Sequence, residues 1–243
     1  MARKWCDVQV AVQPVSVLAP IPKELTFPED VAPLSPPRSS QSLAGRVEIG
    51  DSDEHFQVIP ARYGDLVPYD ALPLPTRGPL ILRASVIDRL DTAALSLPEP
   101  FSLAVLDGWR SPQYQAKLMS YYVSLHPSLD DGYVADPNDS LVLPPHTTGG
   151  AVDLTLSWNG IPLALGTDYD SFHDEAHLMW LEENAQRDTT ARNLRRLLAR
   201  ALRGAGFAPY PMEWWHWSFG DQWWAAEYGF ETSLFPRAER PEL

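Results

Sequence analysis

The chain has 243 residues, of which 44% are hydrophobic and 21% are charged, so it carries enough apolar side chains to bury a substantial core. Its formal net charge of -13 argues against general binding to nucleic acid or to an anionic membrane, because both require a positive surface. We therefore expect neither of them as a partner.

The cysteine content and the first residues bear on the compartment. Cys6 is the only cysteine, which excludes an internal disulfide and with it a disulfide-stapled secreted fold. Arg3 and Lys4 are basic, but Gln9 and Pro14 interrupt the apolar core that a signal peptide would need next. No apolar run approaches the roughly 20 residues that span a bilayer. These observations predict a cytoplasmic location.

The first part of the chain differs in composition from the rest. Prolines crowd the first forty residues, and residues 35–42 are rich in proline and serine, which disfavours regular structure. We expect residues 1–44 to form an extended Pro-rich arm that drapes over the body. Residues 45–243 are expected to form one domain.

Strand-like and helix-like segments alternate beyond the arm. One helix is predicted to begin at Ser111-Pro112, and another has Asp188 or Thr189 as its cap and Gly204 as its stop. The predicted fold class is α+β, with a small antiparallel sheet flanked by helices. Short apolar runs predict the strands at 47–49, 101–106, 151–158 and 214–219.

Four separated stretches contain the residue types of a catalytic site, at 107–110, 146–153, 166–170 and 213–216. A catalytic zinc takes three protein ligands, typically imidazole nitrogens and a carboxylate oxygen, and leaves one position open for water. His146, Asp153 and His216 supply that set. The sequence therefore predicts a zinc site carried by the sheet.

The spacing of these residues requires a turn in each segment. His146 and Asp153 are seven positions apart and would face opposite sides of an unbroken strand. The glycine pair at 149–150 lets the chain turn, so that the histidine curls back over the position that the aspartate faces. Glu213 and His216 come together if the glutamate lies in a turn and the histidine on the strand that follows. The sequence does not show that the two segments meet.

The remaining polar residues suggest roles around such a metal. Glu213 is three residues from a ligand and is positioned to take a proton from water and deliver it to the leaving amine. Arg110, just ahead of the helix start, can stabilise an oxyanion as a bidentate donor. Asp170 can pair with a substrate ammonium. The strand period of two puts Trp214 on the same face as His216, which makes it the candidate for lining a substrate pocket.

The motifs H-x6-D, E-x-W-H, D-G-W-R-S and G-T-D-Y-D, in their order along the chain, resemble those of the D-alanyl-D-alanine dipeptidases of vancomycin-resistant bacteria and their relatives. The resemblance runs from about residue 56 to residue 230 and implies a small α+β zinc peptidase domain. It implies hydrolysis of the amide bond of a free dipeptide such as D-Ala-D-Ala in the cytoplasm, a reaction of cell wall metabolism. The positions that match the family's functional residues are His146, Asp153 and His216 as zinc ligands, Glu213 as base, Arg110 as transition-state arginine and Asp170 near the amino end of the substrate.

The chain departs from the family pattern beside the first zinc histidine. The family commonly has a serine two positions before this histidine, where it helps to hold the substrate amino group. This chain has Pro144 at that position, and proline cannot make that hydrogen bond. The arginine usual two positions after this histidine is Thr148, and the proline that commonly follows the transition-state arginine is displaced to Pro112. These departures leave open a related zinc amidase or peptidase that acts on another small peptide or on a specialised-metabolite intermediate.

Two further functions compete with hydrolysis of a small peptide. A non-catalytic relative that keeps the metal is disfavoured by Glu213, because a structural zinc has no use for a base beside an open coordination position. A wall peptidase acting on polymerised peptidoglycan would require export, which the first residues do not indicate.

A competing metal site would use His173 and His177. These histidines are four residues apart on an expected helix, which is the spacing of H-E-x-x-H zinc peptidases. That motif requires glutamate directly after the first histidine, whereas Asp174, with a shorter reach, stands here. His55 and His126 have no motif around them and are expected at the surface.

Overall fold

The computed structural model describes residues 17–25, 27, 31–64, 66, 68–76, 78–125 and 133–239. The first 16 residues of the expected arm, including Cys6, and His126 lie outside the described residues. The helices of the described part are α1 (Gln41–Ala44), α2 (Ala84–Leu95), α3 (Pro112–Leu125), α4 (Trp180–Glu183), α5 (Thr189–Gly204) and α6 (Gln222–Tyr228), with 3-10 helices η1 (Ala61–Tyr63), η2 (Pro68–Ala71), η3 (Pro145–Thr148) and η4 (Asp174–Ala176). The strands are β1 (Phe56–Val58), β2 (Ile81–Arg83), β3 (Phe101–Asp107), β4 (Ala151–Trp158), β5 (Ile161–Pro162), β6 (Ala208–Pro209) and β7 (His216–Ser218).

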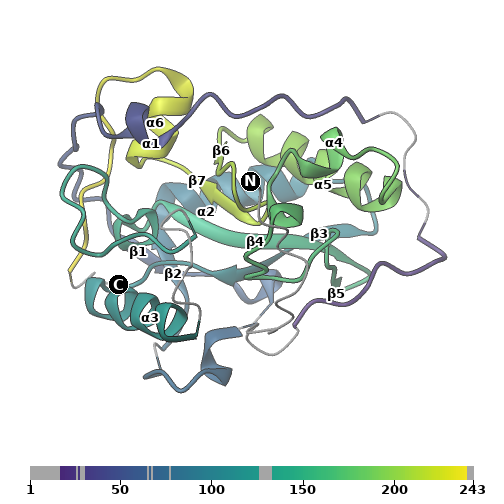
Figure 1. Ribbon diagram of the computed structural model, residues 1–243, viewed down its shortest axis with the longest axis horizontal. Helices are drawn as coiled ribbons and strands as arrows, with labels where there is room; N and C mark the ends of the chain where they lie inside the picture. The colour runs from purple at the N-terminus through teal and green to yellow at the C-terminus, as the bar shows by residue number, and fades with distance from the viewer. Residues whose placement is uncertain are drawn as a thin grey trace, which may run out of the picture.

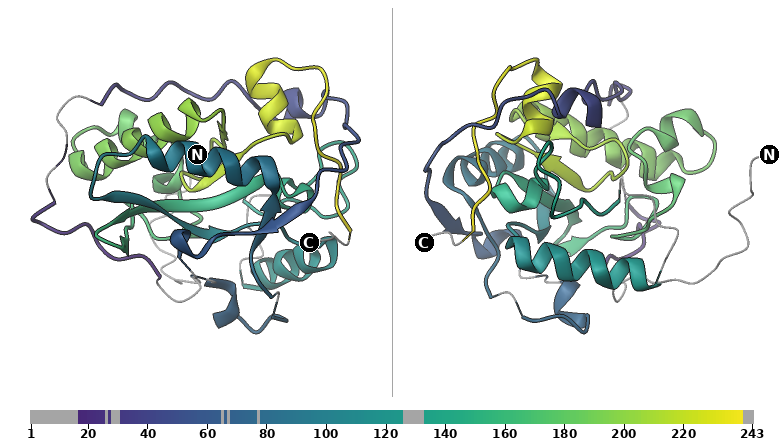
Figure 2. Two further views of the ribbon diagram at one scale, coloured as in Figure 1. Left: turned by 180° about the vertical axis from the view of Figure 1, so that it is seen from behind. Right: turned by 60° about the vertical axis from the view of Figure 1, so that its left-hand side comes forward.

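An antiparallel sheet organises the fold. Its path is β3-β4-β7-β6, with β5 paired to β4, and β1 and β2 form a separate antiparallel pair. Helices α2 and α5 lie on one side of this sheet and α3 lies on the other (Figures 1 and 2). The predicted fold class, a small antiparallel sheet flanked by helices, is confirmed.

Strand β4 has two different buried faces. Val152, Leu154 and Leu156 alternate along it and belong to the main hydrophobic core, where burial of one such side chain stabilises by about 1.5–3 kcal/mol. The opposite face carries Asp153 and Thr155, which are also buried. Buried polar groups are costly unless they are hydrogen-bonded, so the polar face of β4 must be surrounded by partners.

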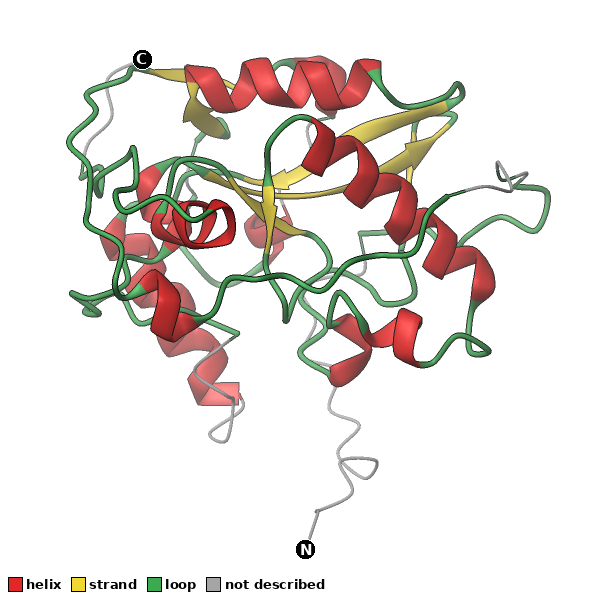
Figure 3. Ribbon diagram, turned by 90° about the horizontal axis from the view of Figure 1, so that it is seen from above, coloured by secondary structure: helices red, strands yellow, loops and turns green. Residues whose placement is uncertain are grey.

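The two predicted helices begin where their capping residues indicate. Ser111 precedes α3, which starts at Pro112, and its hydroxyl oxygen accepts a hydrogen bond from the third residue of the helix at 3.0 Å. Helix α5 spans Thr189–Gly204, and the side chain of Asp188 accepts a hydrogen bond from the Ala191 amide at 2.8 Å. Figure 3 shows the helices packed around the strands of the sheet, seen from above. Within the described part of the chain, no helix combines the length and the apolar character that crossing a bilayer requires.

Two strand predictions are corrected by the structure. The strand predicted at 47–49 is wrong, because only Glu48 pairs, in an isolated parallel bridge to Thr232. The strand predicted at 214–219 is confirmed only for His216–Ser218, since the chain turns before it. Both errors arise because an apolar run does not reveal whether a pairing partner is available.

The described part of the arm lies against the body (Figure 1). The Leu34 amide donates to Glu182 of α4 at 3.2 Å, and the Arg38 and Ser39 amides donate to Glu227 of α6 at 2.5 and 2.9 Å. Residues 31–40 contain no helix or strand, but α1 adds one helical turn where none was expected. The division of the chain at residue 44 stays a prediction.

Candidate metal centre

Strand pairing aligns three side chains across the sheet. Asp153 on β4 lies directly opposite His216 on β7 and opposite Asp107 on β3. Residues that lie opposite each other on neighbouring strands project from the same face. A register shift between Val105 and Asp107 brings the latter into this row. Strand pairing therefore joins segments that are distant in sequence.

A turn returns His146 toward the same row. The histidine lies in η3, which ends at Gly149 in the left-handed region, at φ 78°. A Cβ atom on Gly149 would lie 2.3 Å from an aromatic ring carbon, and one on Gly150 would lie 2.3 Å from a backbone oxygen. Only glycine fits at both positions. The predicted turn between the histidine and the strand is confirmed.

Three donor atoms come together at this point. Among the described residues, His146, Asp153 and His216 are the one group of at least three such side chains that could hold a metal ion, with their ligand atoms all within 4.8 Å. His216 Nδ1 lies 3.2 Å from His146 Nε2 and 3.0 Å from Asp153 Oδ1, and the last two atoms are 3.3 Å apart. Tetrahedral coordination with bonds of about 2.0–2.1 Å requires ligand atoms about 3.3 Å apart. The donors and their spacing therefore fit a tetrahedral metal ion.

The protonation of these residues suits metal binding. His146 Nδ1 lies 2.7 Å from the Gly108 carbonyl oxygen, which only accepts, so Nδ1 carries the proton and Nε2 keeps its lone pair. Burial, aided by the positive charge of Arg110, lowers the pKa of His146 and favours the neutral ring. Burial alone would raise the pKa of Asp153, but the hydrogen bond between its Oδ1 and His216 Nδ1 acts against burial, and that pKa lies well below its usual range.

Glu213 lies beside the three donors without belonging to them. It occupies the turn before β7, as expected, and its Oε2 is 4.0 Å from His216 Nδ1. Burial raises the pKa of Glu213 well above its usual value, and the negative charges of Asp153 and Asp170 add to the rise. A carboxyl group with a raised pKa is therefore next to the candidate metal position.

Arg110 is buried in a network of side chains. Its Nε donates to Asp107 at 2.7 Å, and its Nη1 donates to Gln115 at 3.1 Å. Its Nη2 contacts both the Tyr69 hydroxyl, at 3.1 Å, and Asp153 Oδ2, at 3.3 Å. Both Arg110 and Asp107 are buried, so their ion pair does not lie at the surface.

Asp170 reaches the site from a loop. Its backbone lies in the left-handed region at φ 54°, a conformation that costs free energy for a residue other than glycine and that clusters at functional sites. The carboxylate accepts a hydrogen bond from the Tyr122 hydroxyl at 2.6 Å. Burial raises the pKa of Asp170 to about 7, and the negative charge of Asp153 also raises it.

Sequence reasoning missed four side chains of this network. Tyr169 stood inside a motif, directly before Asp170, so its position was a usable signal. The other three lie outside the motifs and gave no signal in the sequence. The missed residues are Tyr69, Gln115, Tyr122 and Tyr169.

Trp214 lies in the hydrophobic core. It is fully buried, its Nε1 donates to Thr167 at 2.8 Å, and its ring packs against Trp215 at 5.4 Å between centroids. These contacts favour a packing role, and the substrate role of Trp214 stays a prediction.

The competing histidines do not share a helical face. His173 and His177 flank η4, a 3-10 helix of three residues, so the helix expected there is wrong. The His177 ring is instead 3.1 Å from the Tyr133 hydroxyl. His55 is exposed, as expected.

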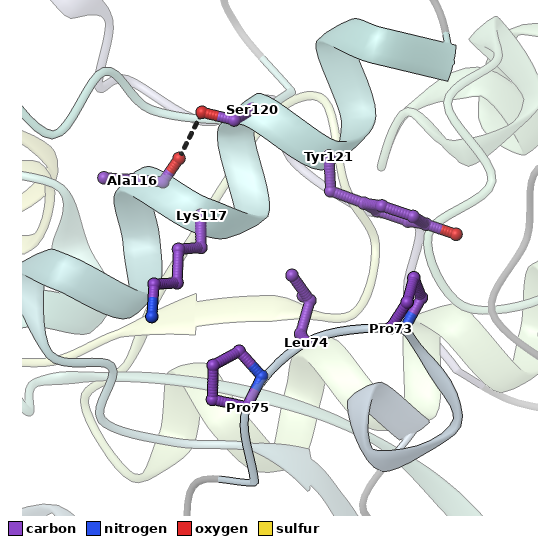
Figure 4. A pocket seen from close by; sticks show the side chains of 7 residues that line it. All are labelled: Pro73, Leu74, Pro75, Ala116, Lys117, Ser120 and Tyr121. Carbon is purple, nitrogen blue, oxygen red and sulfur yellow. Dashed lines mark hydrogen bonds between the residues drawn. The ribbon is translucent and has the colours of Figure 1, made fainter.

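An open groove lies elsewhere, between α3 and the segment after η2 (Figure 4). Its volume is about 470 Å³, and Lys117 and Tyr121 reach into it from the helix. None of its lining residues is a predicted site residue, so the groove does not define the candidate site. The lining residues are Pro73, Leu74, Pro75, Ala116, Lys117, Ser120 and Tyr121.

Buried His, Asp and His donors beside a separate glutamate, on an antiparallel sheet, are the features of a metal-dependent hydrolase. Residues 80–233 match the model of the family Peptidase_M15, described as D-ala-D-ala dipeptidase, and this range includes all four motifs. The chain belongs to this family. It is a hydrolytic enzyme of the metallopeptidase class, and the resemblance found in the sequence is confirmed.

Individual relatives agree with the family match. The chain is 31% identical over 183 residues to a D-alanyl-D-alanine dipeptidase of Synechocystis sp., covering 63% of this chain and 74% of the relative. It is 26% identical over 150 residues to a D-alanyl-D-alanine dipeptidase of Enterococcus faecium, covering 55% and 69%. The solved structure of the vancomycin resistance D,D-dipeptidase VanXYg aligns at 19% identity with a TM-score of 0.38, over 79% of this chain and 70% of that one. Because that TM-score lies below 0.5, family membership rests on the sequence matches.

Proposed function

We propose that the chain is a zinc-dependent dipeptidase that hydrolyses the amide bond of a small dipeptide such as D-Ala-D-Ala. The observation that carries this proposal is the triangle of donor atoms with sides of 3.0 to 3.3 Å, with the Glu213 carboxylate 4.0 Å from one corner. The names of the relatives support the substrate class.

The three donors would hold the zinc ion through His146 Nε2, His216 Nδ1 and Asp153 Oδ1. When bound, zinc supplies a Lewis acid that polarises a carbonyl, makes water more acidic and adds positive charge beside the buried carboxylates. The neutral His146 ring and the ionised Asp153 are the protonation states that metal ligation requires.

Glu213 is the proposed general base. Its carboxylate takes a proton from the attacking water while the water oxygen bonds to the scissile carbonyl carbon. The same group then passes the proton to the amine nitrogen as the carbon–nitrogen bond breaks, which releases two amino acids. Burial raises the pKa of Glu213, and a carboxyl group with a raised pKa accepts a proton from water more readily than an ordinary one.

Arg110 and Asp170 are proposed to orient the charged parts of the reaction. Asp107, Gln115, Tyr69 and Asp153 engage four of the five N–H groups of Arg110, so the one that remains is fixed before the oxyanion develops. Asp170 supplies a carboxylate for the substrate ammonium, and the Tyr122 hydroxyl fixes its orientation.

The groups proposed to act in the reaction are buried. His146, Asp153 and His216 are 4%, 2% and 6% exposed, and Glu213 is 7% exposed. Burial strengthens the electrostatic interactions among them. The choice of a free dipeptide over a polymerised wall peptide is supported by the names of the relatives.

A second candidate keeps the chemistry but changes the peptide. Pro144 has no amide hydrogen to offer a substrate. The hydroxyl groups of Thr147 and Thr148 already donate to backbone carbonyls of η3 and its cap, each at 2.7 Å. Position 144 thus lacks the hydroxyl group that the family's serine supplies, which favours a substrate that differs at its amino end.

The test is to incubate zinc-loaded protein with D-Ala-D-Ala and measure free D-alanine, with L-Ala-L-Ala and mixed dipeptides in parallel. We expect zinc-dependent release that is lost in Glu213→Ala while zinc binding is kept. If none of these dipeptides gives a zinc-dependent product, the proposal is overturned. A kcat/KM for D-Ala-D-Ala of about 10⁴ M⁻¹s⁻¹ or above would exclude the second candidate.

We also propose that the enzyme works in the cytoplasm, supported by the presence of a single cysteine in the sequence. Fractionation of cells that express the tagged full chain tests this location, and recovery outside the cytoplasmic fraction would contradict it.

A further inference from the structure

The two carboxylate oxygens of Asp153 have separate partners. Oδ1 lies 3.0 Å from His216 Nδ1 and 3.3 Å from His146 Nε2, so it completes the donor triangle. Oδ2 accepts a hydrogen bond from the Tyr169 hydroxyl at 2.8 Å and lies 3.3 Å from Arg110 Nη2. The carboxylate is therefore held from the side opposite to its metal-facing oxygen.

Packing fixes the ring of Tyr169. The residue is 1% exposed, and its ring meets Trp215 edge-on at 5.6 Å and Tyr69 at 5.8 Å between centroids. Its own amide donates to the Asp168 side chain at 2.8 Å, which holds the backbone of the loop. The hydroxyl therefore reaches Asp153 from a rigid position.

The direction of the Tyr169 hydrogen bond follows from proton counting. The hydroxyl oxygen lies 2.8 Å from Asp153 Oδ2 and 2.9 Å from the Tyr69 hydroxyl. A phenol has one proton, and an ionised carboxylate can only accept, so that proton goes to Asp153. A hydrogen bond to an ionised oxygen is also stronger than one between two neutral hydroxyls.

We propose that Tyr169 is a positioning residue for the metal centre, which anchors Asp153 through Oδ2 so that the carboxylate offers Oδ1 alone to the ion. This inference rests on the proposed function. Partners that orient a ligating side chain typically contribute 10–100-fold to metal affinity. Without the hydroxyl, the carboxylate is free to rotate and to present both oxygens or a poorly aimed one.

Arg110 does not substitute for Tyr169 in this role. Its contact with Oδ2 is longer, at 3.3 Å, and its other nitrogens are engaged by Asp107 and Gln115. Tyr169 also directly precedes Asp170 in the chain. One short loop therefore contributes both to the orientation of a metal ligand and to the proposed site for the substrate ammonium.

The test compares Tyr169→Phe with Tyr122→Phe. Each variant removes one hydrogen bond between a buried tyrosine and a buried carboxylate, but only the first carboxylate is a proposed ligand. Zinc affinity is measured by competition with a chromophoric chelator, and folding by thermal unfolding of the zinc-free protein. We expect Tyr169→Phe to weaken zinc binding by roughly 10-fold or more and Tyr122→Phe to leave it unchanged.

Cobalt spectroscopy provides a second readout that a merely structural role would not change. Four-coordinate cobalt absorbs visible light more strongly than five-coordinate cobalt. Binding through both oxygens of Asp153 in Tyr169→Phe should therefore weaken the absorption bands of the cobalt-loaded protein. Replacement of Tyr169 by 3-fluorotyrosine keeps the hydroxyl, and we expect it to retain the affinity and the spectrum of the original protein even if the phenylalanine variant folds poorly.

The outcomes separate this inference from the proposed function. Wild-type zinc affinity and cobalt spectrum in Tyr169→Phe would overturn the positioning role, and so would an equal loss of affinity in Tyr122→Phe. If the unmodified protein itself shows no zinc binding that depends on His146 and His216, the proposed function fails. If it binds zinc and hydrolyses dipeptide but Tyr169→Phe behaves identically, only the positioning role fails.

Discussion

The candidate site has a sheet half, formed by Asp107, Asp153 and His216 on paired strands, and a loop half, formed by the loop at 165–177. A buried arginine supports each half in a different way. Arg110, beside the sheet, is held by the side chains of Asp107 and Gln115. Arg195, on α5, donates instead to the backbone carbonyls of Leu165, Glu175 and His177 at 2.7, 2.7 and 2.8 Å. Burial lowers the pKa of Arg195 to about 9. The first arginine has a proposed role in the reaction, whereas the second holds the loop that carries Asp170.

This difference shows that the two halves have separate supports. Strand pairing alone places Asp107, Asp153 and His216 in one row. The loop at 165–177 contains no strand, and three of its carbonyl groups accept hydrogen bonds from a buried donor outside it, Arg195. Damage to the sheet half should therefore affect metal binding and catalysis directly. Damage to the loop half should mainly affect stability and substrate binding, and should reach the metal donors only through the hydrogen bond from Tyr169 to Asp153.

The largest effect is expected from Glu213→Gln in the sheet half. Loss of the general base should lower kcat by about 10²–10⁴-fold while zinc stays bound, because Glu213 is not a donor of the triangle. Turnover and zinc content measured on the same preparation test this. Glu227→Gln is the matched control, since Glu227 is also buried but holds the arm, and its kcat should be unchanged. A Glu213→Gln variant with normal kcat would remove the glutamate from the mechanism.

Arg110→Lys should have the next largest effect. A lysine keeps the charge but cannot contact Asp107, Gln115 and the reacting carbonyl oxygen together, so kcat should fall by about 10²–10³-fold. Steady-state kinetics at saturating zinc measure this, and Arg62→Lys, in the surface pair with Asp91, is the control. A rise in KM with no change in kcat would show that Arg110 binds the substrate without stabilising the transition state.

Arg195→Met tests the loop half directly. One buried and two partly buried carbonyls lose their donor, so the free energy of unfolding should fall by roughly 1–3 kcal/mol, as measured by urea denaturation. We expect KM for the dipeptide to rise more than zinc affinity falls, because the three donors lie on the sheet side and only the Tyr169 hydroxyl reaches them from the loop. Arg200→Met, at an exposed position of the same helix, should change neither the free energy of unfolding nor KM. Equal losses of zinc affinity and substrate affinity would show that the two halves share one support.

The smallest effect concerns the arm and depends on pH. Burial alone would raise the pKa of Glu182, but its bonds to Arg196 and to the Leu34 amide outweigh burial and lower it below 4.5. A carboxyl group with a lowered pKa in the folded state stabilises the fold above its unfolded pKa, and this contribution is lost as the pH falls through its folded pKa. Glu182→Gln should therefore lower the free energy of unfolding by about 1 kcal/mol or less at pH 7, and by progressively less as the pH falls below 4.5.

Urea denaturation at pH 7 and at about pH 3 measures this difference. Glu183→Gln, at the exposed neighbouring position, is the control and should show no such dependence. If the two variants lose the same stability at both pH values, the arm is not held through Glu182.

Local chemistry explains what could be predicted from the sequence. Ser111 and Asp188 cap their helices because a side-chain oxygen can reach an amide two or three residues away. The turn at 149–150 follows from the freedom of glycine. The residues brought together as donors were identified because zinc accepts few residue types, and a motif records their spacing.

The sequence by itself thus determined the helix starts, the glycine turn and the identity of the candidate donors, because each depends on interactions within a few residues. Only the tertiary structure decided that Asp107, Asp153 and His216 share a row and that Tyr169 anchors the second oxygen of Asp153. Strand register and side-chain packing join residues that are 16 to 109 positions apart in the numbering. No local pattern records such contacts, since they depend on the free energy of the whole fold.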